Sequence, residues 1–317
     1  MRPILITMGD PAGIGPEVVA KSLARVGGGK PITVVGCKRC LEEVSELCGL
    51  KLRFSSVDEP THLVDSVPVI DMGGEDVQKG RATPEGGVYS YRYVVRAAEM
   101  VREGKASALV TGPMNKLAVN MAGIRFTGHT ELLAELAGGV KVKMLLYLDE
   151  LRVSHVTTHI PLRDVPTSIS KEEIHLTVRL TASFLRRLGE EVNIAVAGLN
   201  PHAGDGGVMG REEIEIIGPA VEELRSEGIG VEGPLPPDTV FLRALRGEFN
   251  AVVAMYHDQG HIPAKIIGFS RAVNVTLGLP YVRTSVDHGT AYDIVGRCVA
   301  DEGSMLKALE LAFRLAE

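Results

Sequence analysis

The sequence contains no tryptophan, and aromatic residues make up only 4 % of its 317 residues. Proteins that stack bases or sugars rely on aromatic side chains, and this composition does not indicate an aromatic stacking surface. Basic residues are not in excess either, since 34 Lys and Arg stand against 40 Asp and Glu for a net charge of −6. Because binding to a phosphate backbone requires a basic surface, we do not expect nucleic acid to be the main partner.

Long apolar stretches are also missing. The apolar run near the start, in "MRPILITMGD", is too short for the core of a secretory signal, and no run approaches a membrane-spanning length. These absences predict a cytoplasmic protein that has no membrane partner.

Cysteines are few, and they are placed poorly for a disulfide framework. Cys37, Cys40 and Cys48 lie close together in the sequence, whereas Cys298 is remote. Cys37 and Cys40 form a C-x-x-C, but no second pair follows at zinc-site spacing. We therefore expect reduced cysteines and disfavour a redox or zinc role for this pair.

Common catalytic motifs give little guidance. The stretch "GDPAGIGPE" resembles neither the dinucleotide G-x-G-x-x-G nor the phosphate-loop G-x-x-x-x-G-K-[ST], and the G-x-S-x-G of serine hydrolases is missing from the chain. The glycine-rich "GDPAGIGPE" fits either a strand-to-helix turn, with Pro16 in the first helical turn, or a backbone anion site.

What the sequence does contain is an alternation of short apolar runs and helical periodicity. Helical stretches are expected at 84–103, 170–189, where Ser170 and Glu173 have capping-box spacing, 210–228 and 303–316. Strands are expected at 3–8, 32–36, 108–112, 142–148, 152–158, 193–199, 251–256 and 272–277. This pattern predicts an α/β fold whose largely parallel sheet is covered on both faces, and the length favours two lobes.

Three of the predicted strands are followed closely by a histidine. These are His159, His202 and His257. Ligands bind at strand ends in open α/β sheets, and three imidazoles can hold one divalent metal with a position left open for substrate. We therefore expect the three to converge on a metal. The alternative is that each histidine caps its own loop.

Further polar residues suit a phosphorylated acid. His129 and Thr130, in "GHTELLAE", lie at an expected helix start, where unpaired N–H groups attract anions. Lys265, Asn274 and Arg283 follow the 251–256 strand. Arg could hold such an anion through two hydrogen bonds and Lys as a point charge. The alternatives are plain capping at the helix start and solvated surface charges for Lys265 and Arg283.

Long segments of the chain resemble the 4-hydroxythreonine-4-phosphate dehydrogenase family. The match runs nearly end to end through "ITMGDPAGIGPE", "GHTELLAE", "TTHIPLRDVP", "GLNPHAGDGGVMGREE", "GPLPPDTVF", "AMYHDQGHIPAK" and "VNVTLGLPYVRTSVDHGTAYDI". The resemblance implies a homodimer of two-lobed α/β/α subunits, similar to isocitrate and isopropylmalate dehydrogenases, with a shared active site in the cleft between lobes. We expect one lobe from 1–125 and 270–317, and a second from 126–269 that carries the metal ligands and dimer contacts.

The resemblance also implies roles for single residues. It assigns His159, His202 and His257 to a divalent metal (Zn, Mg or Co). It assigns His129, Thr130, Lys265, Asn274 and Arg283 to substrate, with Lys265 and His129 as catalytic candidates. The cofactor, NAD or NADP, comes from the family alone.

The implied reaction is oxidation and decarboxylation of 4-phosphohydroxy-L-threonine to 3-amino-2-oxopropyl phosphate, a step in pyridoxine biosynthesis. The segment "HDQGHIPAK", which contains His261, is similar instead to a branch of the family that acts on D-threonate or D-erythronate 4-phosphate and gives dihydroxyacetone phosphate. An aromatic cis-dihydrodiol carboxylate dehydrogenase ranks third. The alternative from another class is a non-redox metal-dependent lyase or binding protein.

Overall fold

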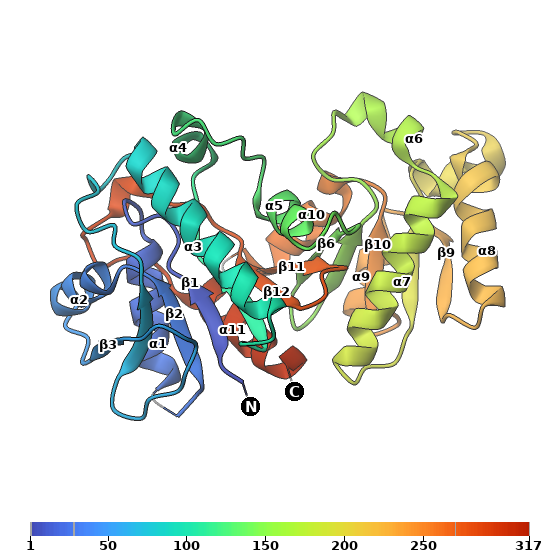
Figure 1. The fold of residues 1–317 in the computed structure, drawn as a ribbon. Coiled ribbons are helices and arrows are strands. Elements are labelled where there is room, and N and C mark those ends of the chain that lie inside the picture. The colour runs from blue at the N-terminus through green and yellow to red at the C-terminus, as the bar shows by residue number, and fades with distance from the viewer. Residues whose placement is uncertain (1, 28, 270, 317) are drawn as a thin grey trace. The chain divides into compact units, whose positions relative to one another are not determined.

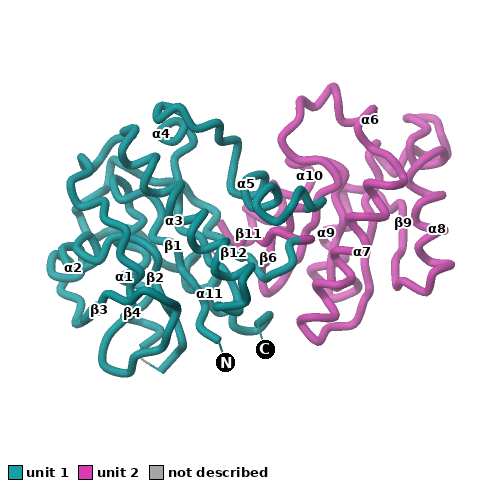
Figure 2. Tube along the Cα trace, viewed as in Figure 1, with its two compact units in different colours: residues 1–142, 279–317 teal, residues 143–278 magenta. Residues whose placement is uncertain are grey.

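The structure is a computed structural model that describes residues 2–27, 29–269 and 271–316 (Figure 1). It divides into two compact units, which are shown in different colours in Figure 2. Unit 1 comprises residues 1–142 and 279–317, and unit 2 comprises residues 143–278. Residues 126–142 and 270–278 thus lie in the opposite unit from the lobe that the sequence analysis gave them.

The described part of unit 1 contains a parallel sheet in the order β3-β4-β2-β1-β5-β12. Its strands are β1 (Ile4–Thr7), β2 (Ile32–Gly36), β3 (Phe54–Ser56), β4 (Val67–Asp71), β5 (Ala108–Thr111) and β12 (Val282–Val286). Its helices are α1 (Gly15–Val26), α2 (Lys38–Leu47), α3 (Pro84–Arg102), α4 (Lys116–Met121), α5 (His129–Leu136) and α11 (Gly303–Ala316).

Alternation along β12 separates the two faces of this sheet. Thr284 donates a 2.8 Å hydrogen bond from Oγ1 to the carbonyl of Ala308 in α11. Because successive side chains point to opposite faces, Arg283 and Ser285 lie on the face away from α11. The glycine-rich loop after β1 is a strand-to-helix turn with Pro16 at the start of α1, which agrees with one of the two interpretations left open by the sequence.

Unit 2 has a mixed sheet in the order β11-β6-β7-β10-β8-β9, in which β6 is antiparallel to both neighbours and the other described pairs are parallel. Its strands are β6 (Lys143–Tyr147), β7 (Arg152–His155), β8 (Ile194–Ala197), β9 (Val231–Leu235), β10 (Ala251–Ala254) and β11 (Val273–Leu277). Its α-helices are α6 (Val165–Ser168), α7 (Lys171–Arg187), α8 (Gly218–Ser226), α9 (Val240–Leu245) and α10 (His257–Gly268). Shorter helical turns are η1 (Leu162–Asp164), η2 (Pro201–Gly207) and η3 (Glu213–Ile217), and η4 (Tyr292–Ile294) belongs to unit 1.

Helices cover both faces of the unit 2 sheet. Ser154 of β7 hydrogen-bonds Thr181 of α7 at 2.6 Å, oxygen to oxygen. The next residue back, Val153, belongs instead to the apolar cluster that contains Val240 and Phe241 of α9. Since neighbouring strand residues face opposite ways, α7 and α9 lie on opposite faces. The predicted α/β/α layering is therefore present in this unit.

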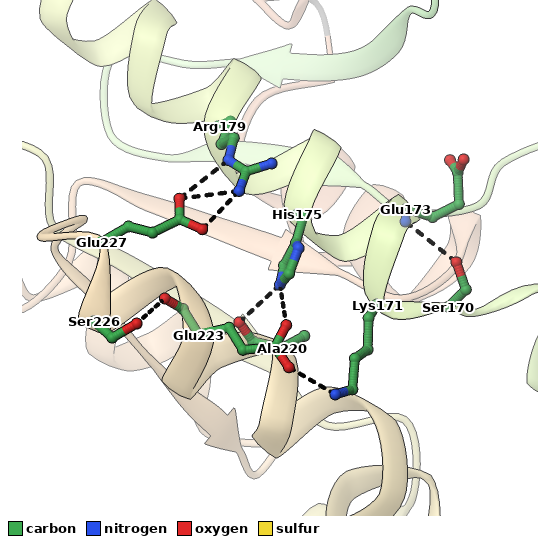
Figure 3. A network of polar contacts seen from close by, with 9 residues as sticks. All are labelled: Ser170, Lys171, Glu173, His175, Arg179, Ala220, Glu223, Ser226 and Glu227. Carbon is green, nitrogen blue, oxygen red and sulfur yellow. Dashed lines mark hydrogen bonds and ion pairs between the residues drawn. The ribbon is translucent and has the colours of Figure 1, made fainter.

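The eight predicted strands are all present, but one predicted helix is altered. The 210–228 stretch is a π-helical turn, Glu213–Ile217, followed by α8. Helix α7 begins as its capping sequence predicts, because Ser170 Oγ accepts from the backbone N–H of Glu173 at 3.3 Å (Figure 3). The Glu173 carboxylate binds Lys143 Nζ at 2.6 Å.

The expectation of reduced cysteines is wrong for two of the four. Cys48, at the end of α2, forms a disulfide with Cys298, whereas Cys37 and Cys40 remain thiols. A partner 250 residues away in the sequence leaves no spacing signal, so the sequence could not indicate the pair. Within the described residues, no helix has the length and apolar character needed to cross a bilayer.

Candidate functional site

A cluster of imidazole rings lies at the carboxyl ends of β7 and β10 in unit 2. These two strands are parallel neighbours, with Ala254 beside His155 in register. His159 lies in the loop after β7, and His257 begins α10 directly after β10. Because the strand ends are adjacent, the two rings approach to 5.7 Å between centroids. The structure thus brings together two of the three predicted metal ligands.

The environment of His257 suits a metal ligand. Its Nδ1 lies 2.7 Å from Oδ1 of Asp258, and since a carboxylate only accepts, Nδ1 carries the proton. Nε2 then keeps the lone pair that a metal or a proton would take. A cavity of about 500 Å³ is lined here by Thr158, His159, Ile160, Leu162, Val165, Tyr256, His257 and Asp258.

Two further histidines, His155 and His261, pack next to the His257 ring. His261, one turn along α10, stacks on the His257 ring at 3.6 Å between centroids. Its Nδ1 lies 3.1 Å from Nε2 of His155 and 3.2 Å from the carbonyl of His257. Burial, followed by the charge of His261, lowers the pKa of His155 to about 3, so that ring is neutral near pH 7. His261, whose role the sequence left open, therefore packs behind the His257 ring in the buried part of the cluster.

His202 is not part of this cluster. It is exposed in the η2 turn after β8, where the backbone from His202 to Gly206 is left-handed. Among the described residues, no group of three or more His, Cys, Asp or Glu side chains could hold a metal ion. One chain therefore offers two of the three predicted ligands at one place, and the three-histidine site remains a prediction.

Glu213, which the sequence analysis did not single out, fixes the loop that carries His202. This carboxylate is 3 % exposed. Its Oε1 accepts from the backbone N–H groups of Leu199 and Asn200, each at 2.7 Å. Its Oε2 accepts from the Asn200 side-chain amide at 2.9 Å. Left-handed backbone is costly outside glycine, and these hydrogen bonds fix the chain directly before the left-handed segment that starts at His202.

In unit 1, the charge of Arg283 lies near the start of α5, close enough to act on His129. Arg283 is 3 % exposed and donates from Nη2 to Oγ1 of Thr111 at 2.6 Å. Burial lowers its pKa to about 10, which leaves the guanidinium charged at neutral pH. Helix α5 begins after Gly128, which makes no side-chain cap hydrogen bond, and the N–H groups at a helix start attract anions.

His129 lies in the first turn of α5 beside this charge. Its Nε2 is buried and has no hydrogen-bond partner. Burial, then the charges of Arg283 and Lys116, lowers its pKa well below the usual value. A neutral imidazole with an unsatisfied buried nitrogen is suited to hydrogen-bonding a substrate oxygen. His129 and Arg283, predicted from distant parts of the sequence, thus lie together.

The remaining predicted substrate residues lie in the two units as follows. Thr130 is the second residue of α5 in unit 1 and is partly buried. Lys265 is on α10 of unit 2, with Nζ 5.0 Å from the ring centre of Phe269. Asn274 is in β11 of unit 2, and its Oδ1 is buried without a hydrogen-bond partner. An unsatisfied buried amide oxygen is consistent with a ligand-binding role.

Nearly the whole chain is similar to a known protein family and to several known relatives. The family model described as "Pyridoxal phosphate biosynthetic protein PdxA" matches residues 29–312. A D-threonate 4-phosphate dehydrogenase of Salmonella typhimurium is 44 % identical, over 99 % of both chains. A 4-hydroxythreonine-4-phosphate dehydrogenase of Desulforapulum autotrophicum is also 44 % identical, over 98 % of this chain and 95 % of its own.

Solved structures agree with the fold. The crystal structure of a 4-hydroxythreonine-4-phosphate dehydrogenase from Klebsiella pneumoniae has a TM-score of 0.91 and 43 % identity, over 100 % of both chains. A β-decarboxylating dehydrogenase from Thermococcus kodakarensis has a TM-score of 0.52 at 16 % identity, over 99 % of this chain and 84 % of its own. The second likeness is one of fold alone. Together the comparisons confirm the predicted family resemblance and α/β fold class.

Proposed function

Because the chain belongs to the family of the pyridoxal phosphate biosynthetic protein PdxA, we propose that it is a nicotinamide-dependent dehydrogenase acting on a 4-phosphorylated hydroxy acid. The proposed substrate is 4-phosphohydroxy-L-threonine, and the products are 3-amino-2-oxopropyl phosphate, CO₂ and the reduced cofactor. The proposed compartment is the cytoplasm. The observation that carries the proposal is the pair His159 and His257 beside a cavity of about 500 Å³.

The chemistry follows from the substrate. A hydride leaves the carbon that bears the secondary hydroxyl and passes to NAD⁺ or NADP⁺, and the hydroxyl proton is released. The resulting ketone is β to the carboxylate, so the bond to CO₂ can break and leave an enolate. A proton delivered to the enolate carbon completes the product. We assign that proton transfer to Lys265 or His129.

Anion binding is assigned to the residues of unit 1. The buried guanidinium of Arg283 and the N–H groups at the start of α5 would hold a phosphate or carboxylate oxygen. His129 and Thr130 would add hydrogen bonds from the first turn of that helix. Asn274 of unit 2, with its unsatisfied buried oxygen, would accept from a substrate hydroxyl or ammonium group.

A divalent metal ion fits the donor set only in part. His159 and His257 would hold it, with Asp258 fixing the His257 tautomer. When bound, such a metal (Zn, Mg or Co) supplies a Lewis acid that lowers the pKa of the hydroxyl and stabilises charge on its oxygen. We propose that His202 of a second copy provides the third imidazole, since His202 of the same chain is not grouped with the other two.

A homodimer is supported by the surface of α10. Ile262, Ile266 and Phe269 are 57 %, 80 % and 71 % exposed. Their spacing places them on one side of the helix that begins with His257. A patch of large apolar residues this exposed marks an interaction surface. A second copy of the chain bound there would lie beside the proposed metal ligands.

A second candidate substrate is D-threonate or D-erythronate 4-phosphate, which would give dihydroxyacetone phosphate. It is favoured by the D-threonate 4-phosphate dehydrogenase of Salmonella typhimurium, which is as similar to this chain as the 4-hydroxythreonine-4-phosphate dehydrogenase cited above. The same oxidation and decarboxylation apply, so the two candidates differ only at the group next to the carboxylate.

One assay tests both. The protein is incubated with Mg²⁺, Zn²⁺ or Co²⁺, with NAD⁺ or NADP⁺ and with each of the three 4-phosphorylated acids, while absorbance of the reduced cofactor is followed. We expect reduction with one acid at a kcat/KM at least about tenfold above the others, as is usual when a polar group is mismatched. Absence of reduction with all three acids would overturn the dehydrogenase proposal and leave the lyase or binding protein.

A further inference from the structure

Helix α2 in unit 1 carries cysteines at both ends, in different chemical states. Cys48, its C-cap residue, is in the disulfide with Cys298. Cys37, its N-cap residue, and Cys40, in its first turn, are thiols. Ten helical residues at 1.5 Å each hold the two ends about 15 Å apart, so the thiols cannot exchange with the disulfide in the folded chain.

The Cys37–Cys40 pair is surrounded by groups that distinguish one thiol from the other. Cys37 Sγ accepts from the backbone N–H of Cys40 at 3.2 Å and lies 3.6 Å from Oε2 of Glu75. Cys40 Sγ instead lies 3.1 Å from Nζ of Lys79. One sulfur therefore faces a carboxylate and the other faces an ammonium group. An ammonium group stabilises a thiolate next to it, and the N-terminal end of a helix does so as well.

Lys79 connects this pair to the surface and to the loop after β1. The residue is exposed, although Cys40 itself is only 1 % exposed. The same Nζ donates to the carbonyl of Pro11 at 3.1 Å. Lys79 is thus an exposed residue in direct contact with the Cys40 sulfur, and a displacement of its side chain would also release a contact to the β1–α1 loop.

We propose that Cys37 and Cys40 form a peroxide-reactive dithiol site, with Cys40 as the attacking thiolate and Cys37 as the resolving thiol. The Cys40 sulfur attacks hydrogen peroxide; an S–O bond forms, the O–O bond breaks and hydroxide leaves. The Cys37 thiol then attacks Cys40–SOH; an S–S bond forms and the S–O bond breaks. The thiol proton leaves with the hydroxyl as water. In sum, two thiols are oxidised and one peroxide is reduced to two waters.

The electrostatics of the pair agree with this division of roles. The neighbouring Cys37 thiol and then Lys79 lower the pKa of Cys40 to about 7, although burial opposes the shift. The pKa of Cys37 is raised by the adjacent Cys40 and by burial, so Cys37 stays protonated. A thiol with a pKa near the ambient pH is the most effective attacking group. This site is separate from the proposed dehydrogenase chemistry and does not depend on it.

The test uses the full chain with its Cys48–Cys298 disulfide intact. Protein is treated with hydrogen peroxide at pH 7, and peptides are quantified by mass spectrometry. We expect a new Cys37–Cys40 linkage in wild type. In Cys37→Ser we expect a Cys40 sulfenic acid that dimedone traps, and in Cys40→Ser we expect no oxidation of Cys37.

Lys79→Met tests the thiolate directly. Lys38→Met is the matched control, because Lys38 lies on the same helix as Cys40 and its ammonium group forms an ion pair with Glu42. At pH 7, Lys79→Met should react about three- to tenfold more slowly than Lys38→Met. The pH midpoint of Cys40 alkylation, near 7 in wild type, should move upward in Lys79→Met only. Equal rates in the two Lys variants, oxidation of Cys37 in Cys40→Ser, or a rate independent of peroxide concentration would each overturn the proposal. The wild-type alkylation profile decides the matter even if a Cys variant does not fold.

Discussion

The guanidinium of Arg283 is anchored to Oγ1 of Thr111 by a 2.6 Å hydrogen bond from Nη2. The two residues lie on the neighbouring parallel strands β12 and β5, where Ser285 is the register partner of Thr111. A buried Arg loses rotamer freedom when it is held in this way, so the charge is already oriented before a ligand arrives. Thr111 was not among the predicted site residues.

Loss of the Arg283 guanidinium group, which can donate two hydrogen bonds to one anion, should therefore weaken binding of the phosphorylated acid. We expect Arg283→Lys, which keeps the charge but loses the two-pronged geometry, to raise KM about tenfold or more with a smaller change in kcat. Thr111→Val should raise KM less, because only the anchor is lost. Steady-state kinetics with the preferred acid provide the measurement. An unchanged KM in Arg283→Lys would show that Arg283 does not contact the substrate.

A mixing experiment tests whether two copies share the metal site. His202→Ala and His159→Ala are each expected to abolish metal-dependent turnover while leaving the circular dichroism spectrum unchanged. If His202 acts on the other copy's His159 and His257, mixed dimers contain one intact site. Denaturing and refolding an equal mixture should then restore about a quarter of wild-type activity. A mixture of His159→Ala and His257→Ala is the matched control, and it should stay inactive. No recovery in the first mixture would contradict the shared site. It would mean either that all three histidines of one chain bind the metal together or that the three do not form a metal site.

Much of the sheet could be predicted because buried parallel strands are continuous apolar runs. β12 was missed because Arg283, Thr284 and Ser285 interrupt its apolar character, although all are buried. β9 was missed because "VEGPL" contains Gly and Pro, which usually exclude a strand. No helix was among those expected directly after β10, but α10 begins at His257 and contains Pro263 in its interior.

The candidate site was predictable only as far as strand neighbours determine it. β7 and β10 are adjacent, so His159 and His257 meet. His202 follows β8, which also neighbours β10, but its glycine-rich turn enters the left-handed region over His202, Ala203, Gly204, Asp205 and Gly206. A sequence shows that such a loop is free to turn, not which way it points. The role of Glu213 could not be predicted either, since two of its hydrogen-bond donors are backbone N–H groups, which leave no signal in the sequence.

Buried and exposed ion pairs within unit 2 should differ in their contribution to stability. Lys143 Nζ binds Glu173 at 2.6 Å and also the carbonyl of Val156, and its side chain is 9 % exposed. Arg179 and Glu227 form a two-pronged pair between α7 and α8, but their side chains are 50 % and 44 % exposed (Figure 3). Lys143→Met should lower the free energy of unfolding by about 1–3 kcal/mol, because it removes the ammonium group from a partly buried carboxylate.

Arg179→Met, the matched control, should change the same quantity by about 0–1 kcal/mol, because solvent already screens that pair. Urea unfolding followed by circular dichroism gives both values. Equal losses in the two variants would mean that burial does not decide the strength of these pairs.

The Cys48–Cys298 disulfide should stabilise unit 1 mainly by restricting the unfolded chain. It closes a loop with a sequence separation of 250 residues, and a longer closed loop restricts the unfolded chain more. The double variant Cys48→Ser/Cys298→Ser should lose about 2–4 kcal/mol of unfolding free energy. Adding a reducing agent should lower the melting temperature of wild type but not of the variant. A wild-type melting temperature that reductant does not change would contradict the bond or its role.

The neutral state of His129 predicts a specific pH dependence of stability. Burial and the charges of Arg283 and Lys116 lower its pKa in the folded chain below the ordinary value of 6.5. Below pH 6.5 the unfolded chain therefore binds a proton that the folded chain does not, and stability falls as pH falls. The stabilisation of wild type relative to His129→Gln should be constant above pH 7.5. Between pH 6.5 and 5 it should decline, by at most about 1.4 kcal/mol per pH unit. Urea unfolding of both proteins across this range gives the difference directly. A difference that grows as pH falls would require a protonated, ion-paired His129, and would remove its proposed role as a neutral hydrogen-bonding group beside Arg283.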